Sequence, residues 1–158
     1  MIEKKFEKLA EVAVKLVEGI KRTGIKVTDL SERYGKLLMP LEGNVNHVGM
    51  MYAGSLFTIG EMAGGLIHGV SFDYSRFFPI VKEVSIRFLA PAMTDVTLEV
   101  SMSSEEAEVI QNRAEEEGKA DFVLDLEIKD TNGTIVGVVS GTWQIRKTPE
   151  ELKSALSF

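Results

Sequence analysis

Apolar and polar residues alternate along several segments in the second half of the chain. Val84, Ile86 and Phe88 alternate with charged or polar neighbours, and the same two-residue period returns at 97–102 and 122–129. Successive side chains of a strand point to opposite faces of a sheet, so this period predicts strands with one buried face.

An Asn-Gly pair at 132–133 separates the last of these segments from residues 134–146. Asn-Gly between two alternating runs is a strong hairpin signal, because both central residues of the expected two-residue turn have positive φ. We therefore expect four strands from residue 83 onward, with the last two joined as an antiparallel hairpin.

Residues 51–70 follow a different pattern. This segment is apolar and rich in glycine, alanine and serine, and Glu61 is its one charged residue. Each glycine costs about 1 kcal/mol relative to alanine inside a helix, so several together indicate that neighbouring backbone approaches closely. We interpret the segment as a long buried helix wrapped by a sheet, with His68 as a packing residue. Two strands are the alternative.

The first part of the chain adds one helix and one short strand. Apolar side chains recur at helical spacing from Glu3 to Lys21, and Gly24 follows. This pattern predicts a single amphipathic helix docked on the domain, because its polar face has mixed charge and lacks the basic bias of membrane-surface helices. A short strand is expected around Arg33 to Leu38, closed by Pro40.

Residues 103–118 form a strongly acidic segment between two expected strands. Its start, with Ser103 three residues before Glu106, fits a capping box, so we expect a solvated helix there. The element order then predicts an α+β domain in which a strongly curved antiparallel sheet covers a long central helix. Residues 1–24 are expected to form an extra N-terminal helix of the same domain, which continues over 25–158.

Composition narrows the classes of partner. The chain has 18 basic and 24 acidic residues, a net charge of −6, and no basic cluster that would match a phosphate backbone. No stretch approaches the roughly 20 apolar residues of a membrane span. We therefore expect no nucleic-acid or membrane partner and a cytoplasmic location. With no cysteine and two histidines, we expect no disulfide, no structural zinc and no other metal or cofactor.

Candidate chemistry concentrates between Asn46 and Glu61. The first amides of a helix lack intrahelical partners, so those near Ala53 and Gly54 form a donor site for a developing oxyanion. Asn46, in the preceding loop, can hold a water or a carbonyl. Glu61 is a carboxylate in an apolar helix and can act as a general base or a nucleophile.

Helix geometry limits how these groups cooperate. Eight residues at 1.5 Å per residue place Ala53 and Glu61 about 12 Å apart along the axis, too far to act on one carbonyl carbon. A two-fold dimer with antiparallel helices would bring Ala53 of one chain near Glu61 of the other and create two equivalent sites. The functional interpretation therefore predicts a homodimer, or a dimer of two such dimers.

Structural roles compete with the functional ones. Glu61 could pair with a basic side chain such as Arg87, and His47 could be an ordinary loop residue instead of a base. Tyr52 could gate a pocket or simply fill the helix start. For the pairs Met50-Met51 and Phe77-Phe78, we expect core packing in preference to acyl-chain lining.

The segment resembles the central-helix signature of hotdog-fold thioesterases of the PaaI-like superfamily. That signature has an Asn, a Gly three positions later, a His-Gly-Gly triplet, an apolar run and an Asp or Glu. Here it reads Asn46, Gly49, Tyr52-Ala53-Gly54, residues 56–60 and Glu61. Residues 83–92 are similar to the family's next strand and its closing Pro-Ala.

The resemblance implies a hotdog fold and hydrolysis of an acyl-CoA thioester. Glu61 corresponds to the general base or nucleophile, Asn46 to the group that orients the water or the carbonyl, and the Ala53 amide, with Gly54, to the group that polarises the carbonyl. The substrate is expected to contact His47, Gly49, Tyr52, Phe57, Val81 and Lys82.

The chain departs from the family pattern at three of these positions. Tyr52 replaces the usual His, Ala53 replaces a Gly, and Val81 stands where some members have Ser or Thr. These departures bear on activity more than on fold.

Two other functions remain open at this stage. A 3-hydroxyacyl thioester dehydratase would pair His47 with Glu61, fourteen residues later, and a binding module would hold acyl-CoA without cleaving it. The sequence leaves the acyl group unassigned. For the CoA nucleotide it offers only Arg76, Lys82 and Arg87 as scattered candidates.

Overall fold

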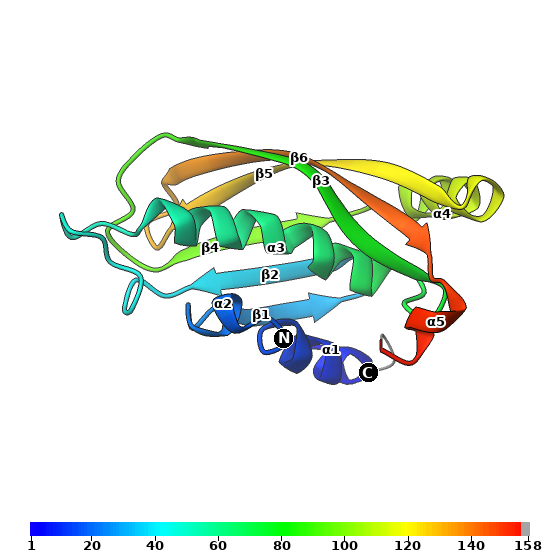
Figure 1. Ribbon diagram of the computed structural model, residues 1–158. Helices are drawn as coiled ribbons and strands as arrows, with labels where there is room; N and C mark the ends of the chain where they lie inside the picture. The colour runs from blue at the N-terminus through cyan, green and yellow to red at the C-terminus, as the bar shows by residue number, and fades with distance from the viewer. Residues whose placement is uncertain (156–158) are drawn as a thin grey trace.

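One curved sheet of six antiparallel strands surrounds a central helix in the computed structural model, which describes residues 1–155 (Figure 1). The strands are β1 (Lys26–Ser31), β2 (Tyr34–Met39), β3 (Phe77–Phe88), β4 (Val96–Ser101), β5 (Lys119–Asp130) and β6 (Ile135–Lys147). Their order in the sheet is β1-β2-β4-β5-β6-β3. The long helix α3 (Ala53–Ser71) lies in the concave side of this sheet. The predicted hotdog architecture is confirmed.

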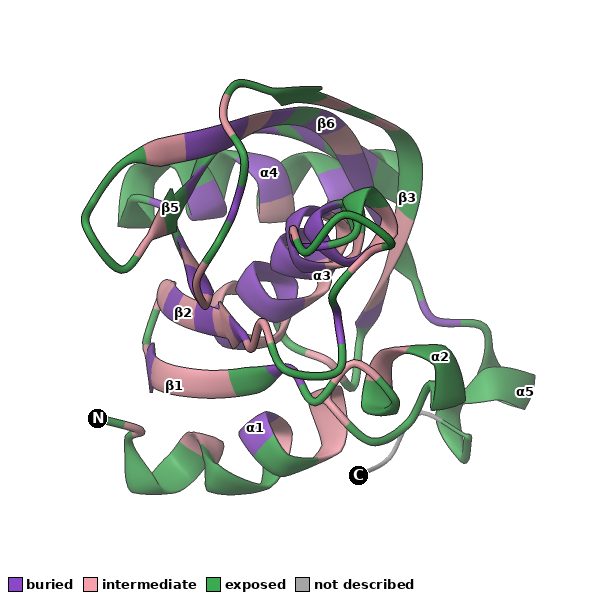
Figure 2. Cartoon of the chain, turned by 90° about the vertical axis from the view of Figure 1, so that its left-hand side faces the viewer, coloured by how far each residue is buried: buried purple, intermediate pink, exposed green. Residues whose placement is uncertain are grey.

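Close packing of α3 against the sheet explains its glycines. A β-carbon at Gly60 would come 2.7 Å from Val139, and one at Gly64 would come 2.0 Å from the indole nitrogen of Trp143. Both partners lie on β6, so glycine at these positions lets the strand approach the helix. Seen along α3, the strands curve around its buried residues (Figure 2). His68 is fully buried in this core, as expected.

The predicted two-residue period holds along β5. Every second residue of β5 from Ala120 to Ile128 is buried, and the residues between them are exposed. β5 and β6 form the expected hairpin, but the expected turn type was wrong. Gly133 has a φ of 82°, whereas Asn132 does not share this positive φ. The side chain of Asp130 instead accepts the amides of Asn132 and Thr134 at 2.9 Å, which supports a wider turn.

The sequence pattern did not reveal β1. This strand joins β2 through a tight turn in which Arg33 has a φ of 57°. Leu30 is its one buried residue, and a register shift between Val27 and Asp29 interrupts the pairing with β2. The bulge breaks the alternation on which strand prediction depends. β2, in contrast, covers the expected strand and ends directly before Pro40.

The single helix expected over Glu3–Lys21 was wrong. The segment contains a 3-10 turn, η1 (Lys4–Phe6), and two short helices, α1 (Glu7–Ala13) and α2 (Glu18–Lys21). Val17 is extended, with φ −103° and ψ 117°, and both Leu16 and Val17 are exposed. Three valines at 12, 14 and 17 lower the helical preference of this stretch because β-branched side chains lose rotamer freedom in a helix. The break leaves Leu9 of α1 packed near Gly69 of α3.

The acidic segment forms helix α4 (Ser104–Glu117), as predicted. The Ser103 side chain accepts the Glu106 amide at 3.1 Å, which supplies one half of the expected capping box. β4 pairs with β5 only over residues 96–98 and 128–130, and α4 packs against β5 through Ala107, Ile110 and Ala114. A short helix, α5 (Glu150–Lys153), follows β6. Among residues 1–155, none of the helices has the length and apolar character required to cross a membrane.

Candidate active site

The start of α3 presents two unpaired amides. Tyr52 precedes the helix, and its carbonyl accepts the amides of Ser55 and Leu56 at 3.0 and 3.2 Å. Within the described part of the chain, no acceptor is recorded for the amides of Ala53 and Gly54. They lie at the positive end of the helix dipole, where an anion is stabilised. The helix start can therefore donate to an oxyanion, as the sequence suggested.

A buried asparagine that was not expected from the sequence fixes this helix start. Asn44 is 6% exposed, and its side-chain nitrogen donates to the carbonyls of Thr23 and Pro40 at 2.7 and 2.8 Å. Its side-chain oxygen accepts the Ser55 hydroxyl at 2.8 Å, and its backbone carbonyl accepts the Tyr52 amide at 2.7 Å. No sequence signal separates Asn44 from an ordinary loop asparagine.

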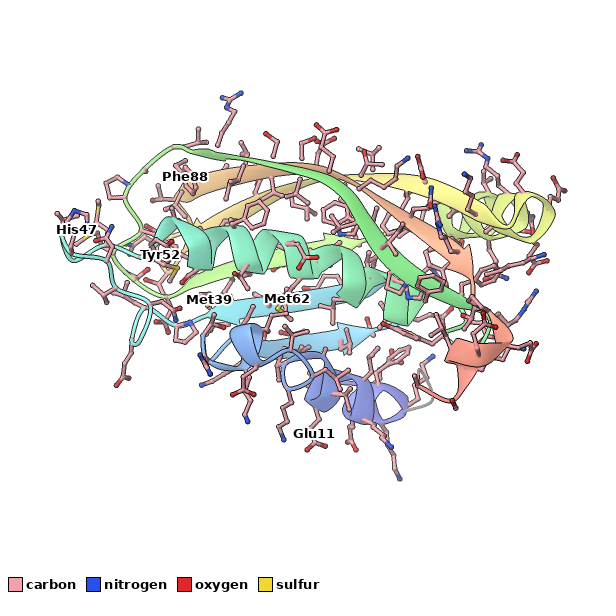
Figure 3. All side chains as sticks on the ribbon, viewed as in Figure 1. Glu11, Met39, His47, Tyr52, Met62 and Phe88 are labelled. Atoms are coloured by element: carbon pink, nitrogen blue, oxygen red, sulfur yellow. The ribbon has the colours of Figure 1, made fainter. Side chains whose placement is uncertain are left out.

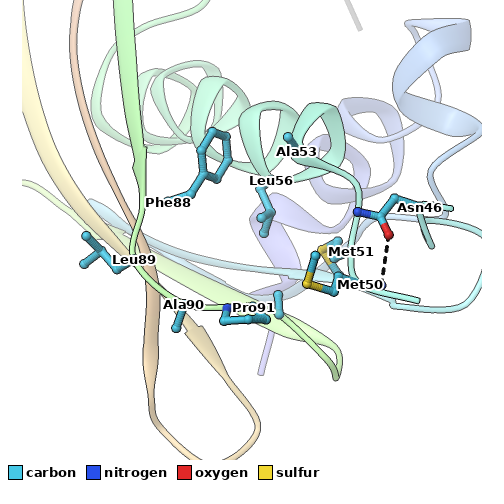
Figure 4. A pocket seen from close by; sticks show the side chains of 10 residues that line it. Asn46, Met50, Met51, Ala53, Leu56, Phe88, Leu89, Ala90 and Pro91 are labelled. Atoms are coloured by element: carbon cyan, nitrogen blue, oxygen red, sulfur yellow. Dashed lines mark hydrogen bonds between the residues drawn. The ribbon is translucent and has the colours of Figure 1, made fainter. Parts of the chain in front are cut away.

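Asn46 lies in the tight loop before the helix. Its side-chain oxygen accepts the amides of Val48 and Met50 at 3.0 and 3.1 Å, so that oxygen is committed to the loop. Gly49 supports the same turn with a φ of 84°. The side-chain nitrogen of Asn46 has no hydrogen-bond partner among residues 1–155, and it points from the loop toward a pocket (Figure 4), whereas the backbone amide donates to the Met50 carbonyl at 2.7 Å. This narrows the role expected for Asn46 to that of a donor.

The pocket beside the helix start has a volume of about 340 Å³. Asn46 and Ala53 line it from the loop and the helix (Figure 4). The other walls are apolar and consist of Met50, Met51, Leu56, Phe88, Leu89, Pro91 and the alanines at 90 and 92. None of the lining residues is ionisable, so the pocket suits an uncharged group. Met50-Met51 was expected in the core in preference to an acyl-chain lining; Met51 is buried, yet both methionines line this pocket.

Glu61 lies two turns further along α3 and does not line this pocket. Its side chain is partly buried, and this burial raises the pKa of its carboxyl group. None of the ion pairs in the described part of the chain includes Glu61, so the alternative pairing with Arg87 is not formed. A carboxyl group with a raised pKa is better suited to accept a proton than a surface carboxylate.

The side of α3 that carries Glu61 remains open. Ala53, Phe57 and Glu61 follow at four-residue intervals, which places them along one side of the helix. Phe57 is 40% exposed, and a β-carbon at Gly65, the next position in this series, would meet nothing within 4 Å. The sheet of the same chain therefore leaves this stripe uncovered.

The remaining loop residues lie around the helix start. Tyr52 is exposed, and its ring covers Gly54 so closely that a β-carbon there would come 2.3 Å from the ring. His47 lies at the exposed end of the loop, beyond Tyr52 (Figure 3). Gly49 is also exposed. Neither His47 nor Gly49 lines the pocket.

Two predicted contacts on β3 point to opposite faces of the sheet. Val81 is paired with Trp143, which packs on α3, so Val81 faces the helix and is 45% exposed. Lys82 occupies a register shift and forms an ion pair with Asp121 at 2.7 Å. Asp121 is exposed, whereas its neighbour Phe122 is buried, so Lys82 lies on the outer face, away from the pocket.

The proposed nucleotide ligands do not form one cluster. Arg76 pairs with Glu115 at 2.8 Å, and Lys82 pairs with Asp121. Within residues 1–155, no three His, Asp or Glu side chains are arranged to hold a metal ion.

Comparison with known proteins places the chain in a family. The family model described as a domain of unknown function (DUF4442) matches residues 5–145. A protein of unknown function from Pseudomonas aeruginosa, named a probable thioesterase, is 37% identical with a TM-score of 0.86, and the match covers 90% of this chain and 95% of that chain. Among curated proteins, none matches the chain significantly.

More distant structures share the fold. A protein of unknown function from Chlorobaculum tepidum is 19% identical, with a TM-score of 0.79 over 90% of this chain and 94% of that chain. A thioesterase from Haemophilus influenzae is 13% identical, with a TM-score of 0.68 over 90% of each chain. The chain therefore belongs to the DUF4442 family, and it has the hotdog fold.

Proposed function

We propose that this protein is a PaaI-like acyl-CoA thioesterase that acts as a cytoplasmic homodimer. One observation carries the proposal: the helix start at Ala53, with its free amide, and the Asn46 side-chain nitrogen adjoin an apolar pocket, and a carboxyl group with a raised pKa lies two turns further along α3. The 37% identical relative, named a probable thioesterase, supports the same class of reaction.

The open stripe on α3 supports the dimer. Ala53 and Glu61 lie symmetrically about Phe57, so an antiparallel second helix centred on Phe57 places each Ala53 beside the partner's Glu61. Within residues 1–155, β3 pairs only with β6 and forms one edge of the sheet, with Val81 and Phe88 exposed on its α3 side. A second copy would cover both this edge and the stripe, which otherwise expose apolar surface.

In the proposed reaction, water is the nucleophile. The water oxygen forms a bond to the thioester carbon, and Glu61 of one subunit takes a proton from this water at the same time. The amides of Ala53 and Gly54 of the other subunit hold the negative charge that develops on the carbonyl oxygen. The carbon–sulfur bond then breaks, Glu61 returns the proton to the CoA thiolate, and the products are a free acid and CoA.

The dehydratase alternative receives less support. It requires a histidine beside the helix carboxylate, and His47 lies at the exposed tip of its loop and outside the pocket. A binding module without turnover is an outcome of the test below.

Release of CoA thiol from a series of acyl-CoA esters tests the proposal. We expect turnover by the wild type, a loss of at least about 100-fold in kcat for Glu61→Gln, and wild-type rates for the control Glu116→Gln on the exposed side of α4. Hydration of crotonyl-CoA without thiol release would support the dehydratase. Binding of acyl-CoA without any turnover would support the binding module.

A further inference from the structure

The lining of the pocket points to the class of acyl group. Met51, Leu56 and Ala92 are buried and form the base of this open pocket, whereas Phe88 and Leu89 are about half exposed in the single chain. The Met51 amide donates to the Ala92 carbonyl at 2.9 Å, which fixes the loop before α3 to the segment after β3. The base of the pocket is therefore held in place by a backbone hydrogen bond between two segments that are distant in the sequence.

The polar groups lie at one side only. Asn46 and the start of α3 at Ala53 meet the apolar walls from the same side of the pocket (Figure 4). A thioester carbonyl placed at these donors leaves its acyl chain among methionine, leucine, phenylalanine and alanine side chains. A charged acyl terminus would lose its water there without gaining a partner.

The volume of the pocket limits how much of an acyl chain it can cover. A water occupies about 30 Å³ of liquid, so 340 Å³ holds about ten atoms of carbon size. Met50 and Met51 are flexible and can adapt to chains of different shape.

We infer that the enzyme acts on uncharged, apolar acyl groups of about six to ten carbons, with the acyl chain in this pocket. The inference rests on the proposed thioesterase function for its kinetic test but not for its binding test.

The kinetic test compares kcat/KM for acetyl-, hexanoyl-, decanoyl-, palmitoyl- and succinyl-CoA. We expect a rise of about threefold to fourfold per methylene up to about ten carbons, no further gain for palmitoyl-CoA, and succinyl-CoA at least about 100-fold below hexanoyl-CoA. Ala90→Leu should lower kcat/KM for decanoyl-CoA at least about tenfold and spare acetyl-CoA, because its larger side chain fills the pocket. The control Ala13→Leu, in α1, should have the same kcat/KM as the wild type for each ester.

The binding test separates this inference from the proposed function. Calorimetry with Glu61→Gln, which should not turn over, is expected to show that decanoyl-CoA binds at least about 100-fold more tightly than CoA, and that succinyl-CoA binds no more tightly than CoA. If binding depends on chain length but the wild type shows no turnover, the acyl chain binds in this pocket and the proposed thioesterase function is wrong. If turnover is faster with succinyl-CoA or acetyl-CoA, or does not depend on chain length, the assignment of the acyl chain to this pocket is wrong. The proposed thioesterase function would still hold.

Discussion

Ser55, in the first turn of α3, donates its hydroxyl to the side chain of the buried Asn44 at 2.8 Å. Asn44 also donates to the carbonyls of Thr23 and Pro40, so one side chain connects two further segments to the start of the helix. We expect Asn44→Ala to lower the free energy of unfolding by about 2–3 kcal/mol, since three buried hydrogen bonds are lost.

Urea denaturation measures this effect, and Ser55→Ala is the matched variant. It removes only one of the three hydrogen bonds and should cost about 1 kcal/mol. Equal losses for the two variants would show that Asn44 does not anchor the other segments.

Two adjacent glycines of α3 should respond in opposite directions to alanine. At Gly64, a β-carbon would collide with Trp143 at 2.0 Å, and we expect Gly64→Ala to destabilise the fold by about 1–3 kcal/mol. At Gly65 the same change meets nothing within 4 Å in its own chain and should stabilise the helix by up to about 1 kcal/mol. Thermal unfolding of both variants tests this contrast, and a stabilised Gly64→Ala would contradict the packing described for Trp143.

His68 should make the fold sensitive to acid. Burial lowers its pKa from 6.5 to about 3, and its ring packs against those of Phe72 and Tyr74. Below pH 6.5 the unfolded chain takes up a proton that the folded chain does not, so this histidine reduces the free energy of unfolding as the pH falls from 6.5 toward 3. The loss reaches about 4 kcal/mol at pH 3.

Urea unfolding across this pH range compares the wild type with His68→Leu. The variant should lose stability less steeply with falling pH, whereas the exposed-site control His47→Gln should decline as the wild type does. If the free energy of unfolding falls equally with pH in the wild type and in His68→Leu, His68 is not the cause of the acid sensitivity.

Phe57 is the expected centre of the subunit contact, because Ala53 and Glu61 lie equally far from it along α3. Phe57→Arg would place two cations together at the two-fold axis, and we expect the variant to sediment as a folded monomer without thioesterase activity. Val123→Arg is the matched control, since Val123 is also an exposed apolar residue but lies on β5, away from α3. A dimeric and active Phe57→Arg protein would place the contact elsewhere.

The hotdog architecture, the long central helix and the regular strands could be predicted from the sequence, whereas the irregular elements and the pocket could not. The separation of Ala53 and Glu61 follows from helix geometry alone, and the period of β5 follows from its alternating residues. β1 was missed because its bulge breaks the alternation. The pocket combines the loop at Asn46 with residues after β3, and neither segment carries a signal that they meet at Met51 and Ala92.

We propose that each site combines Glu61 of one subunit with Asn46 and the helix start of the other. Mixing two inactive variants tests this arrangement most directly. Glu61→Gln and Asn46→Ala each damage both sites of their own homodimer. In a mixed dimer, however, one site combines the intact Glu61 of one chain with the intact Asn46 of the other. After subunit exchange in an equal mixture, half of the dimers should be mixed, with one intact site each.

The measurement is the rate of CoA release by this mixture, with the exchange confirmed by mass spectrometry. The shared site predicts recovery to about a quarter of the wild-type rate. If subunit exchange is complete and the rate is no higher than the average of the two separate variants, the site is not shared between subunits.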